Sequence, residues 1–233
     1  MNLTPFSVLI TGANKGLGLE FARQYAADGW RVIATCRDVG RARELHALSP
    51  QLSVHRLDVT DFAAVAALGR TLHAEVIDVL IANAGVLLDD SDHPEAVDYA
   101  AWMRSFEVNA MAPLACAQAF LAQVRCSRER KMIAIGSIVG SIGAARVGGY
   151  YAYRSSKAAL NSVWHALALD HPDLIAAVLH PGHMRTDMTR RGAAWETLAS
   201  PEEKAAQLRQ VIASLKAADS GGFFNSSGKP LPW

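Results

Sequence analysis

Cysteine is scarce in this sequence, and long hydrophobic runs are lacking. The 233 residues include only Cys36, Cys116 and Cys126, and no pair has a Cys-x-x-Cys spacing. This count argues against a disulfide framework and a zinc site, so we expect no metal and three buried free thiols. The longest uncharged apolar stretch, residues 132–145, contains three glycines and is too short to span a bilayer.

An excess of charge of one sign is also lacking. The sequence has 23 basic and 22 acidic residues, which gives a formal net charge of +1. We therefore predict neither nucleic-acid binding nor attraction to an acidic membrane. Residues 1–5 show no basic stretch followed by an apolar run, so no secretory signal is predicted and a cytoplasmic location is expected.

Apolar residues are abundant, at 51% of the chain against 19% charged residues, which suits a large core. Short β-branched runs alternate with helical patterns. Strands are predicted at 7–11, 31–37, 53–58, 76–82, 131–137, 175–180 and 222–225, and helices at 17–28, 39–47, 62–74, 99–125, 151–170 and 201–217. Strands such as 79–82 are apolar on both faces, as in parallel sheets covered by helices on each side. We predict one doubly wound, Rossmann-type α/β domain over residues 1–233, with a mostly parallel seven-stranded sheet.

Three segments read as irregular loops: 86–98, 140–149 and 182–200. In open parallel sheets, ligands bind outside the carboxyl ends of the strands, so these loops are expected to set specificity. In the first loop, Asp89, Asp90 and Asp92 are predicted to be solvated. In the third, Met184, Met188 and Trp195 can line a substrate pocket or dock on the core.

A glycine-rich turn follows the first predicted strand and precedes the first predicted helix. Glycine permits a tight turn and lets backbone amides approach a pyrophosphate at the positive end of a helix. The spacing is Gly-x-x-x-Gly-x-Gly, which differs from the usual Gly-x-Gly-x-x-Gly fingerprint, but strand, turn and helix occur in the required order. The predicted nucleotide-binding residues here are Gly12, Asn14, Lys15, Gly16, Leu17 and Gly18.

Arg37, at the end of the second predicted strand, favours NADP over NAD. An acidic residue near this point would hold a ribose 2′-hydroxyl, whereas an arginine accommodates a 2′-phosphate. Lys15 in the glycine turn would assist it. Alternatively, Arg37 is a solvated surface residue with Asp38 as its partner.

Two further strand ends are candidate nucleotide contacts. Asp58, followed by Val59, can accept the adenine amino group or serve as a turn or helix cap, and the sequence does not separate these readings. The small residues of Asn83-Ala84-Gly85 suggest close approach of the backbone to a ribose, although such residues also end strands routinely.

Tyr153 and Lys157 are four residues apart at the start of a predicted helix, so they share one helix face. Lowering a phenol pKa from about 10 to about 7 requires roughly 4 kcal/mol of preference for the phenolate. A cation about 4 Å away supplies about that much at an effective dielectric of ~20. The pair therefore predicts a tyrosine tuned for acid–base chemistry. The alternative is an aromatic patch of Tyr150, Tyr151 and Tyr153 beside a surface lysine.

Several segments, in this order, resemble the short-chain dehydrogenase/reductase family over nearly the whole chain. The matching segments are Thr11-Gly12-x-x-x-Gly16-x-Gly18, Ala82-Asn83-Ala84-Gly85, Val108-Asn109-Ala110-Met111-Ala112-Pro113, Ser137, Tyr153-x-x-x-Lys157 and Pro181-Gly182-His183-Met184-Arg185-Thr186. Gly140-Ser141-Ile142, the Tyr153 helix and the end Gly228-Lys229-Pro230-Leu231-Pro232-Trp233 are similar to the C-factor or sniffer-like carbonyl reductase branch. Ala82 departs from the family's first Asn, and Ser137 and Tyr153 are sixteen residues apart, which exceeds the common spacing. The surplus is expected within 144–149.

The resemblance implies an NADP-dependent enzyme that uses NADPH to reduce an aldehyde or ketone to an alcohol. Tyr153 would be the general acid, Ser137 would bind the carbonyl oxygen, and Lys157 would hold the nicotinamide ribose. Asn109 would anchor a water that passes protons to Lys157. Pro181 and Gly182 join the cofactor-binding set, and Met184 and Thr186 would contact the nicotinamide carboxamide.

The expected partners are a small carbonyl or alcohol substrate and further copies of the chain, as a homodimer or homotetramer. The main rival function is an NAD(P)-binding signalling or sensor protein of the C-factor type, in which turnover is secondary. A third reading is an assembly module built on the helices predicted at 99–125 and 151–170.

Overall fold

The structure, a computed structural model, describes residues 5–49, 51–88, 93–190 and 195–233. The three aspartates predicted to be solvated, Asp89, Asp90 and Asp92, lie outside these ranges. The loop predicted at 182–200 is described except for residues 191–194.

Seven strands form one sheet in the order β3-β2-β1-β4-β5-β6-β7, and every neighbouring pair is parallel. The predicted α/β fold is thereby confirmed. The order reverses direction at β1, which creates the switch point where doubly wound folds bind ligands. The strands are β1 (Ser7–Ile10), β2 (Arg31–Cys36), β3 (Leu52–Arg56), β4 (Val79–Ala82), β5 (Lys131–Ile135), β6 (Ile175–His180) and β7 (Phe223–Asn225).

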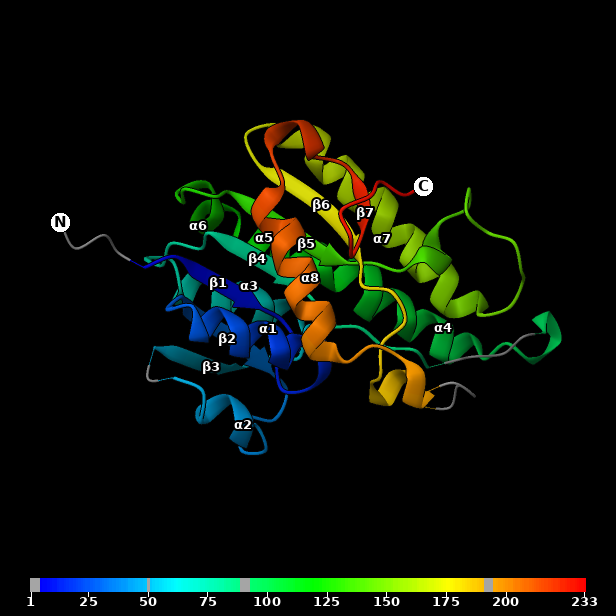
Figure 1. Ribbon diagram of the computed structural model, residues 1–233, viewed down its shortest axis with the longest axis horizontal. Helices are drawn as coiled ribbons and strands as arrows, with labels where there is room; N and C mark the ends of the chain where they lie inside the picture. Colours follow the sequence, from blue (N-terminus) through cyan, green and yellow to red (C-terminus); the bar gives the residue numbers. More distant parts are fainter. Residues whose placement is uncertain (1–4, 50, 89–92, 191–194) are drawn as a thin grey trace.

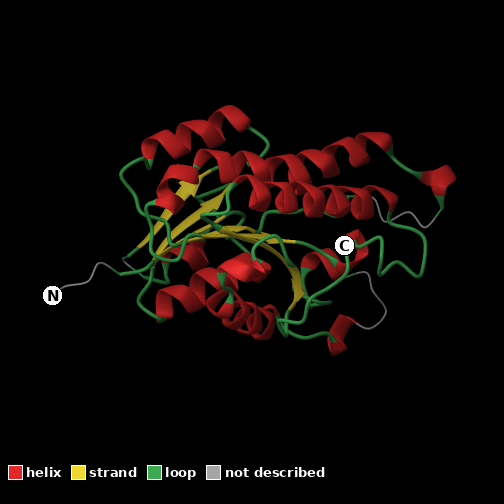
Figure 2. Cartoon of the chain, turned by 90° about the horizontal axis from the view of Figure 1, so that it is seen from above, coloured by secondary structure: helices red, strands yellow, loops and turns green. Residues whose placement is uncertain are grey.

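Helices cover both faces of the sheet, which lies between two helical layers (Figure 2). One face packs on α1 and α8 through side chains such as Phe21 and Leu208, and the other on α5, α6 and α7 through side chains such as Val124 and Trp164. The helices are α1 (Gly16–Ala27), α2 (Arg43–His46), α3 (Phe62–Thr71), α4 (Tyr99–Phe106), α5 (Ala112–Ala119), α6 (Leu121–Arg125), α7 (Tyr151–Asp170) and α8 (Pro201–Ser214). The apolar strands are buried from both sides, as their composition predicts.

The helix predicted at 99–125 is not continuous. It consists of α4, a π-helical turn at Glu107–Met111, α5 and α6. Pro113 has no N–H to donate to the carbonyl of Asn109, so the regular hydrogen-bond ladder cannot run through this turn. π-turns inside helices often mark functional positions, and this one carries Asn109.

The three cysteines are free thiols. Cys36 and Cys116 are buried as predicted, but the expectation is wrong for Cys126, which is exposed just after α6. Within the described ranges, no helix combines the length and the apolar character required to cross a bilayer.

Candidate active site

The parallel strands of the sheet run in the same direction, so their carboxyl ends lie at one edge (Figure 1). β1 leads into the glycine turn, β4 into Asn83, β5 into Ser137 and β6 into Pro181. α7 begins at Tyr151 and brings Tyr153 and Lys157 to the same edge. Segments far apart in the sequence thus meet where the fold is expected to bind ligands.

The glycine turn has the geometry that a phosphate-binding loop requires. Gly12 and Gly16 have φ of 66° and 56°, a region that other residues rarely adopt. A Cβ on Gly18 would lie 2.5 Å from both Asn83 Nδ2 and the Gly12 carbonyl oxygen, so only glycine fits. The N-cap of α1, Lys15, makes no side-chain capping bond among the described residues. The first amides of α1 are therefore available to a pyrophosphate, and the turn fits a dinucleotide.

Asn83 supports the turn. Its Nδ2 donates to the carbonyl oxygens of Thr11 (2.9 Å) and Gly12 (3.2 Å), and its backbone N–H donates to Thr11 Oγ1 (3.0 Å). Thr11 Oγ1 also accepts from the backbone N–H of Ala84 at 3.1 Å. Thr11 thus joins the glycine turn to the end of β4, a role that sequence reasoning missed. The available signal was a hydroxyl residue directly before the first glycine.

Lys157 is a buried cation at the centre of the site, with 4% of its surface exposed. Its Nζ donates to the carbonyl oxygen of Ile135 at 2.8 Å and lies 5.9 Å from the centroid of the Tyr153 ring. Burial lowers the pKa of Lys157 to about 8. The structure therefore brings Tyr153 and Lys157 together, but the Lys157 ammonium is hydrogen-bonded to Ile135, the last residue of β5.

Tyr153 and Ser137 lie within reach of a side-chain hydrogen bond, so the structure brings these two predicted catalytic residues together. Burial raises the pKa of the Tyr153 phenol, because the phenolate is cut off from water, and the Ser137 bond lowers it to a smaller extent. Desolvation is therefore the largest influence on the phenol in this structure, and the lowering expected from Lys157 together with the charge of the cofactor stays a prediction.

Asn109 is fully buried in the π-helical turn. Its side chain accepts from the backbone N–H of Val86 (2.9 Å) and donates to the Val86 carbonyl oxygen (2.9 Å) and to Ser156 Oγ (3.0 Å). A Cβ on Gly85 would lie 3.3 Å from Asn109 Oδ1 and 3.6 Å from Lys157 Nζ. Asn109 thus lies close to Lys157, while its water-anchoring role stays a prediction.

The segment after β6 approaches the glycine turn. A Cβ on Gly16 would lie 3.7 Å from the methyl group of Thr186. Met184 is buried, and its carbonyl oxygen accepts from Thr189 Oγ1 at 2.6 Å. Trp195 donates from its indole Nε1 to the Thr186 carbonyl oxygen at 3.1 Å, so this side chain holds the segment in place. These contacts lie within the loop, so both readings stay open for Trp195, a substrate pocket and docking on the core.

Arg37 is exposed, and within the described ranges it makes no hydrogen bond or ion pair. Asp38, its expected partner as a surface residue, pairs with Arg41 at 3.3 Å. The exposed position of Arg37 fits both a solvated residue and a phosphate contact. Lys15, predicted to assist Arg37, pairs instead with Asp187 at 2.9 Å across the mouth of the glycine turn.

Asp58 stabilises a turn, which is one of the two roles that the sequence left open. Its Oδ1 accepts from the backbone N–H of Thr60 (3.0 Å) and from Thr60 Oγ1 (2.7 Å), as in an Asx turn. These bonds hold the pKa of Asp58 below its usual value. Val59 beside it is buried. Binding of adenine by these two residues stays a prediction.

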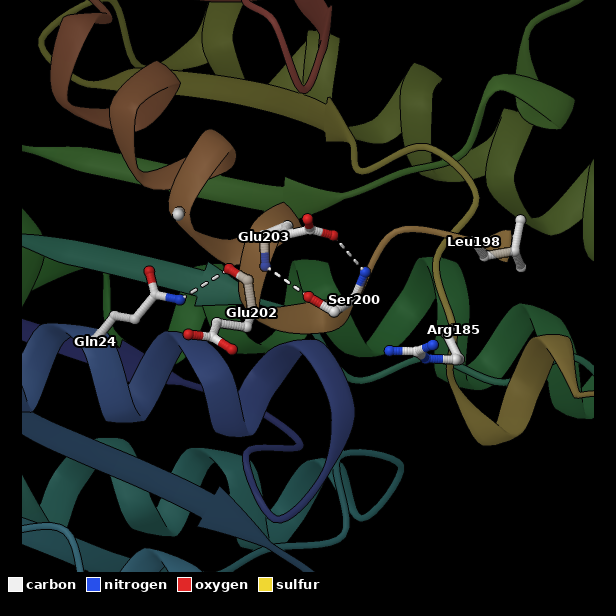
Figure 3. A pocket seen from close by; sticks show the side chains of 7 residues that line it. Gln24, Arg185, Leu198, Ser200, Glu202 and Glu203 are labelled. Carbon is white, nitrogen blue, oxygen red and sulfur yellow. Dashed lines mark hydrogen bonds between the residues drawn. The ribbon is translucent and has the colours of Figure 1, made fainter. Parts of the chain in front are cut away.

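An open hollow of about 680 Å³ lies between α1, α8 and the segment after β6 (Figure 3). Its polar groups are largely bonded to one another: Gln24 donates to the Glu202 carbonyl oxygen, and Ser200 and Glu203 form the capping box of α8. It is lined by Gln24, Arg185, Leu198, Ser200, Glu202, Glu203 and Ala206, and includes none of the predicted catalytic residues. We interpret these hydrogen bonds as contacts that position the start of α8 against α1.

Known proteins share both the sequence pattern and the fold. The sequence model of the short chain dehydrogenase family matches residues 7–197. The C-signal protein of Myxococcus xanthus is 40% identical over 164 residues, covering 67% of this chain and 93% of that protein. The carbonyl reductase Sniffer of D. melanogaster is 29% identical with a TM-score of 0.89, covering 99% of this chain and 100% of that one. The NADPH-bound carbonyl reductase from chicken fatty liver is 31% identical, with the same TM-score and coverage. The family and branch inferred from the sequence are confirmed: the chain belongs to the short-chain dehydrogenase family of oxidoreductases.

Proposed function

We propose that this protein is an NADPH-dependent reductase that converts an aldehyde or ketone to an alcohol. The observation that carries the proposal is the convergence of Ser137, Tyr153 and Lys157 at the strand edge that also bears the glycine turn. Structural similarity to carbonyl reductases, one of them NADPH-bound, supports both the substrate class and the cofactor.

When bound, NADPH would supply the hydride that reaches the carbonyl carbon. Ser137 Oγ donates a hydrogen bond to the carbonyl oxygen and orients it. Tyr153 donates the phenolic proton to the same oxygen as negative charge develops there, which completes the alcohol. Lys157 then stabilises the phenolate electrostatically, with Asn109 close to it.

The proposal is tested by measuring NADPH oxidation with a panel of aldehydes and ketones that varies in size and polarity. We expect turnover with at least one apolar aldehyde or ketone, with the alcohol formed in equal amount to the NADPH consumed. Tight NADPH binding without reduction of any panel member would contradict the reductase proposal. That outcome would favour the rival function, a nucleotide-binding signalling protein, which the similarity to C-signal supports.

Arg37 is proposed to select NADPH by binding the 2′-phosphate, because it is exposed directly after β2 and makes no hydrogen bond or ion pair of ordinary length within the described ranges, with Asp58 as an acidic neighbour. Changing Arg37 to Asp places a negative charge beside that phosphate. We expect the preference for NADPH over NADH, measured as the ratio of kcat/KM values, to fall by roughly 100-fold or more. Arg41→Asp, four residues further along at a residue that is already ion-paired, is the matched control. An unchanged ratio in Arg37→Asp would remove its phosphate role.

A further inference from the structure

The loop between Ser137 and Tyr153 is tied to residues at the far end of the chain. Ser141 Oγ donates to the carbonyl oxygens of Pro232 (2.6 Å) and Trp233 (3.2 Å), and the Gly143 N–H donates to the Trp233 carbonyl oxygen at 2.7 Å. We call these four residues, Ser141, Gly143, Pro232 and Trp233, the tether. It joins positions about 90 residues apart in the sequence.

The tether rests on a firm support. The ring of Trp233 stacks on Phe223 of β7, with centroids 5.5 Å apart, and meets His165 of α7 edge-on at 5.5 Å. The Leu231 N–H donates to the Phe223 carbonyl oxygen at 2.7 Å. Phe223 is fully buried in the core, so residues 231–233 are held by the sheet itself and can fix the loop.

The loop and residues 232–233 are closely packed against each other. Ser141 is 1% exposed. A Cβ on Gly143 would lie 3.1 Å from the Trp233 carbonyl oxygen and 3.2 Å from Pro232 Cβ, which is tighter than ordinary contact. Ser141 Oγ also accepts from the Ala144 N–H at 2.9 Å. One buried hydroxyl therefore joins the loop to its support and shapes the turn that follows.

The other end of the loop is held beside the predicted acid. The guanidinium of Arg154, next to Tyr153 on α7, donates to the carbonyl oxygens of Val139 (3.2 Å), Val147 (2.9 Å) and Gly149 (3.2 Å). The segment between these two anchors includes residues 144–149, where the sequence predicts the surplus residues. The surplus is thus held by specific bonds at both ends.

Between its anchors the loop presents apolar side chains to solvent. Ile142 is 82% exposed and Val147 is 77% exposed. At the start of the loop, a Cβ on Gly140 would lie only 2.7 Å from the backbone of Lys157, so the loop leaves the catalytic edge directly. Covering exposed apolar side chains with an apolar ligand is favourable, because it removes them from water.

We propose that the tether is a positioning element of the substrate site. It holds the 141–149 loop so that Ile142 and Val147 form an apolar rim for the non-reacting part of a carbonyl substrate. This inference rests on the proposed reductase function and adds a substrate class, aldehydes and ketones with a bulky apolar substituent. Ser141 and Trp233 act through the loop and are positioning residues.

The test is Ser141→Ala, which removes both hydroxyl bonds of the tether. With a phenyl alkyl ketone as the probe, we expect KM to rise about tenfold while kcat and NADPH binding stay within about twofold. With acetaldehyde, too small to reach the rim, KM should not change. Trp233→Ala weakens the same support from the other side and is expected to reproduce this pattern. It also serves as the second variant if Ser141→Ala folds poorly. Lys229→Ala, an exposed change in the same segment, is the control.

The outcomes separate the two proposals. Hydrogen exchange at Gly143 and Ala144 should accelerate in Ser141→Ala, because both amide bonds belong to the tethered turn. Faster exchange with an unchanged KM for the phenyl alkyl ketone would overturn the substrate role of the tether and leave the reductase proposal intact. A wild-type protein that binds NADPH but reduces no carbonyl compound would overturn both.

Discussion

Tyr153→Phe is expected to lower kcat for carbonyl reduction by roughly 10²- to 10⁴-fold, the usual contribution of a positioned acid. The ring keeps its packing on α7, but the phenolic hydroxyl beside Ser137, the proposed proton donor, is lost. Because the hydroxyl belongs to the catalytic edge and not to the glycine turn, the affinity for NADPH should stay within about twofold. Steady-state kinetics and NADPH titration by fluorescence measure both quantities.

Tyr151→Phe is the matched control, since it makes the same chemical change two residues earlier in α7. It should keep kcat near the wild-type value. Wild-type turnover in Tyr153→Phe, with normal NADPH binding, would exclude Tyr153 as the acid.

Lys157→Met is expected to abolish measurable reduction and, at the same time, to stabilise the fold in the absence of nucleotide. Lys157 is a buried cation whose Nζ has one hydrogen-bond partner in the described part of the chain, the Ile135 carbonyl oxygen. The difference between a pKa of about 8 and the ordinary value of 10.5 corresponds to roughly 3 kcal/mol of destabilisation at pH 7. The variant also loses the hydrogen bond to Ile135, which costs about 1 kcal/mol of stability. The free energy of unfolding is therefore expected to rise by about 2 kcal/mol.

The stability that Lys157→Met gains over the wild type should depend on pH, and the sign of this dependence follows from the pKa of Lys157. Between about pH 8 and pH 10.5 the unfolded chain binds the lysine proton and the folded chain does not, so wild-type stability rises with pH in this window. The advantage of Lys157→Met is therefore largest at pH 7 and shrinks toward pH 10. Urea unfolding of the nucleotide-free protein at both pH values measures it, with the exposed change Lys229→Met as control. A destabilised Lys157→Met at pH 7 would show that the burial cost assigned to Lys157 is wrong.

Local patterns in the sequence determined much of the fold. β6 and α7 have the predicted bounds, Ile175–His180 and Tyr151–Asp170, because a β-branched run and a strong helical pattern leave little ambiguity there. The helix predicted at 39–47 shrinks to Arg43–His46, since Val39 and Gly40 are poor helix formers at its start. The π-helical turn at Asn109 was not predicted. Its cause, Pro113, was visible, but the response of the helix to it was not.

The candidate site was largely predictable, because parallel strands deliver their carboxyl ends to one edge whatever the details of packing. Features that depend on distant partners were not. Lys15 pairs with Asp187, 172 residues away, and Ser141 bonds to Pro232, 91 residues away. The direction of the Tyr153 pKa also depends on burial, which spacing along a helix does not reveal. Sequence motifs thus identified the candidate site residues, while tertiary packing determined their burial, their distant partners and the direction of the Tyr153 pKa.

The most direct test of the account follows the transferred hydrogen. The wild-type protein is given NADPH deuterated at nicotinamide C4, on either face, together with a ketone from the panel, and the alcohol is analysed by mass spectrometry. We predict that deuterium from one of the two faces appears on the carbinol carbon, and that Tyr153→Phe forms the same labelled alcohol far more slowly. Alcohol without deuterium from either face, or labelled alcohol formed at an equal rate by Tyr153→Phe, would contradict the account.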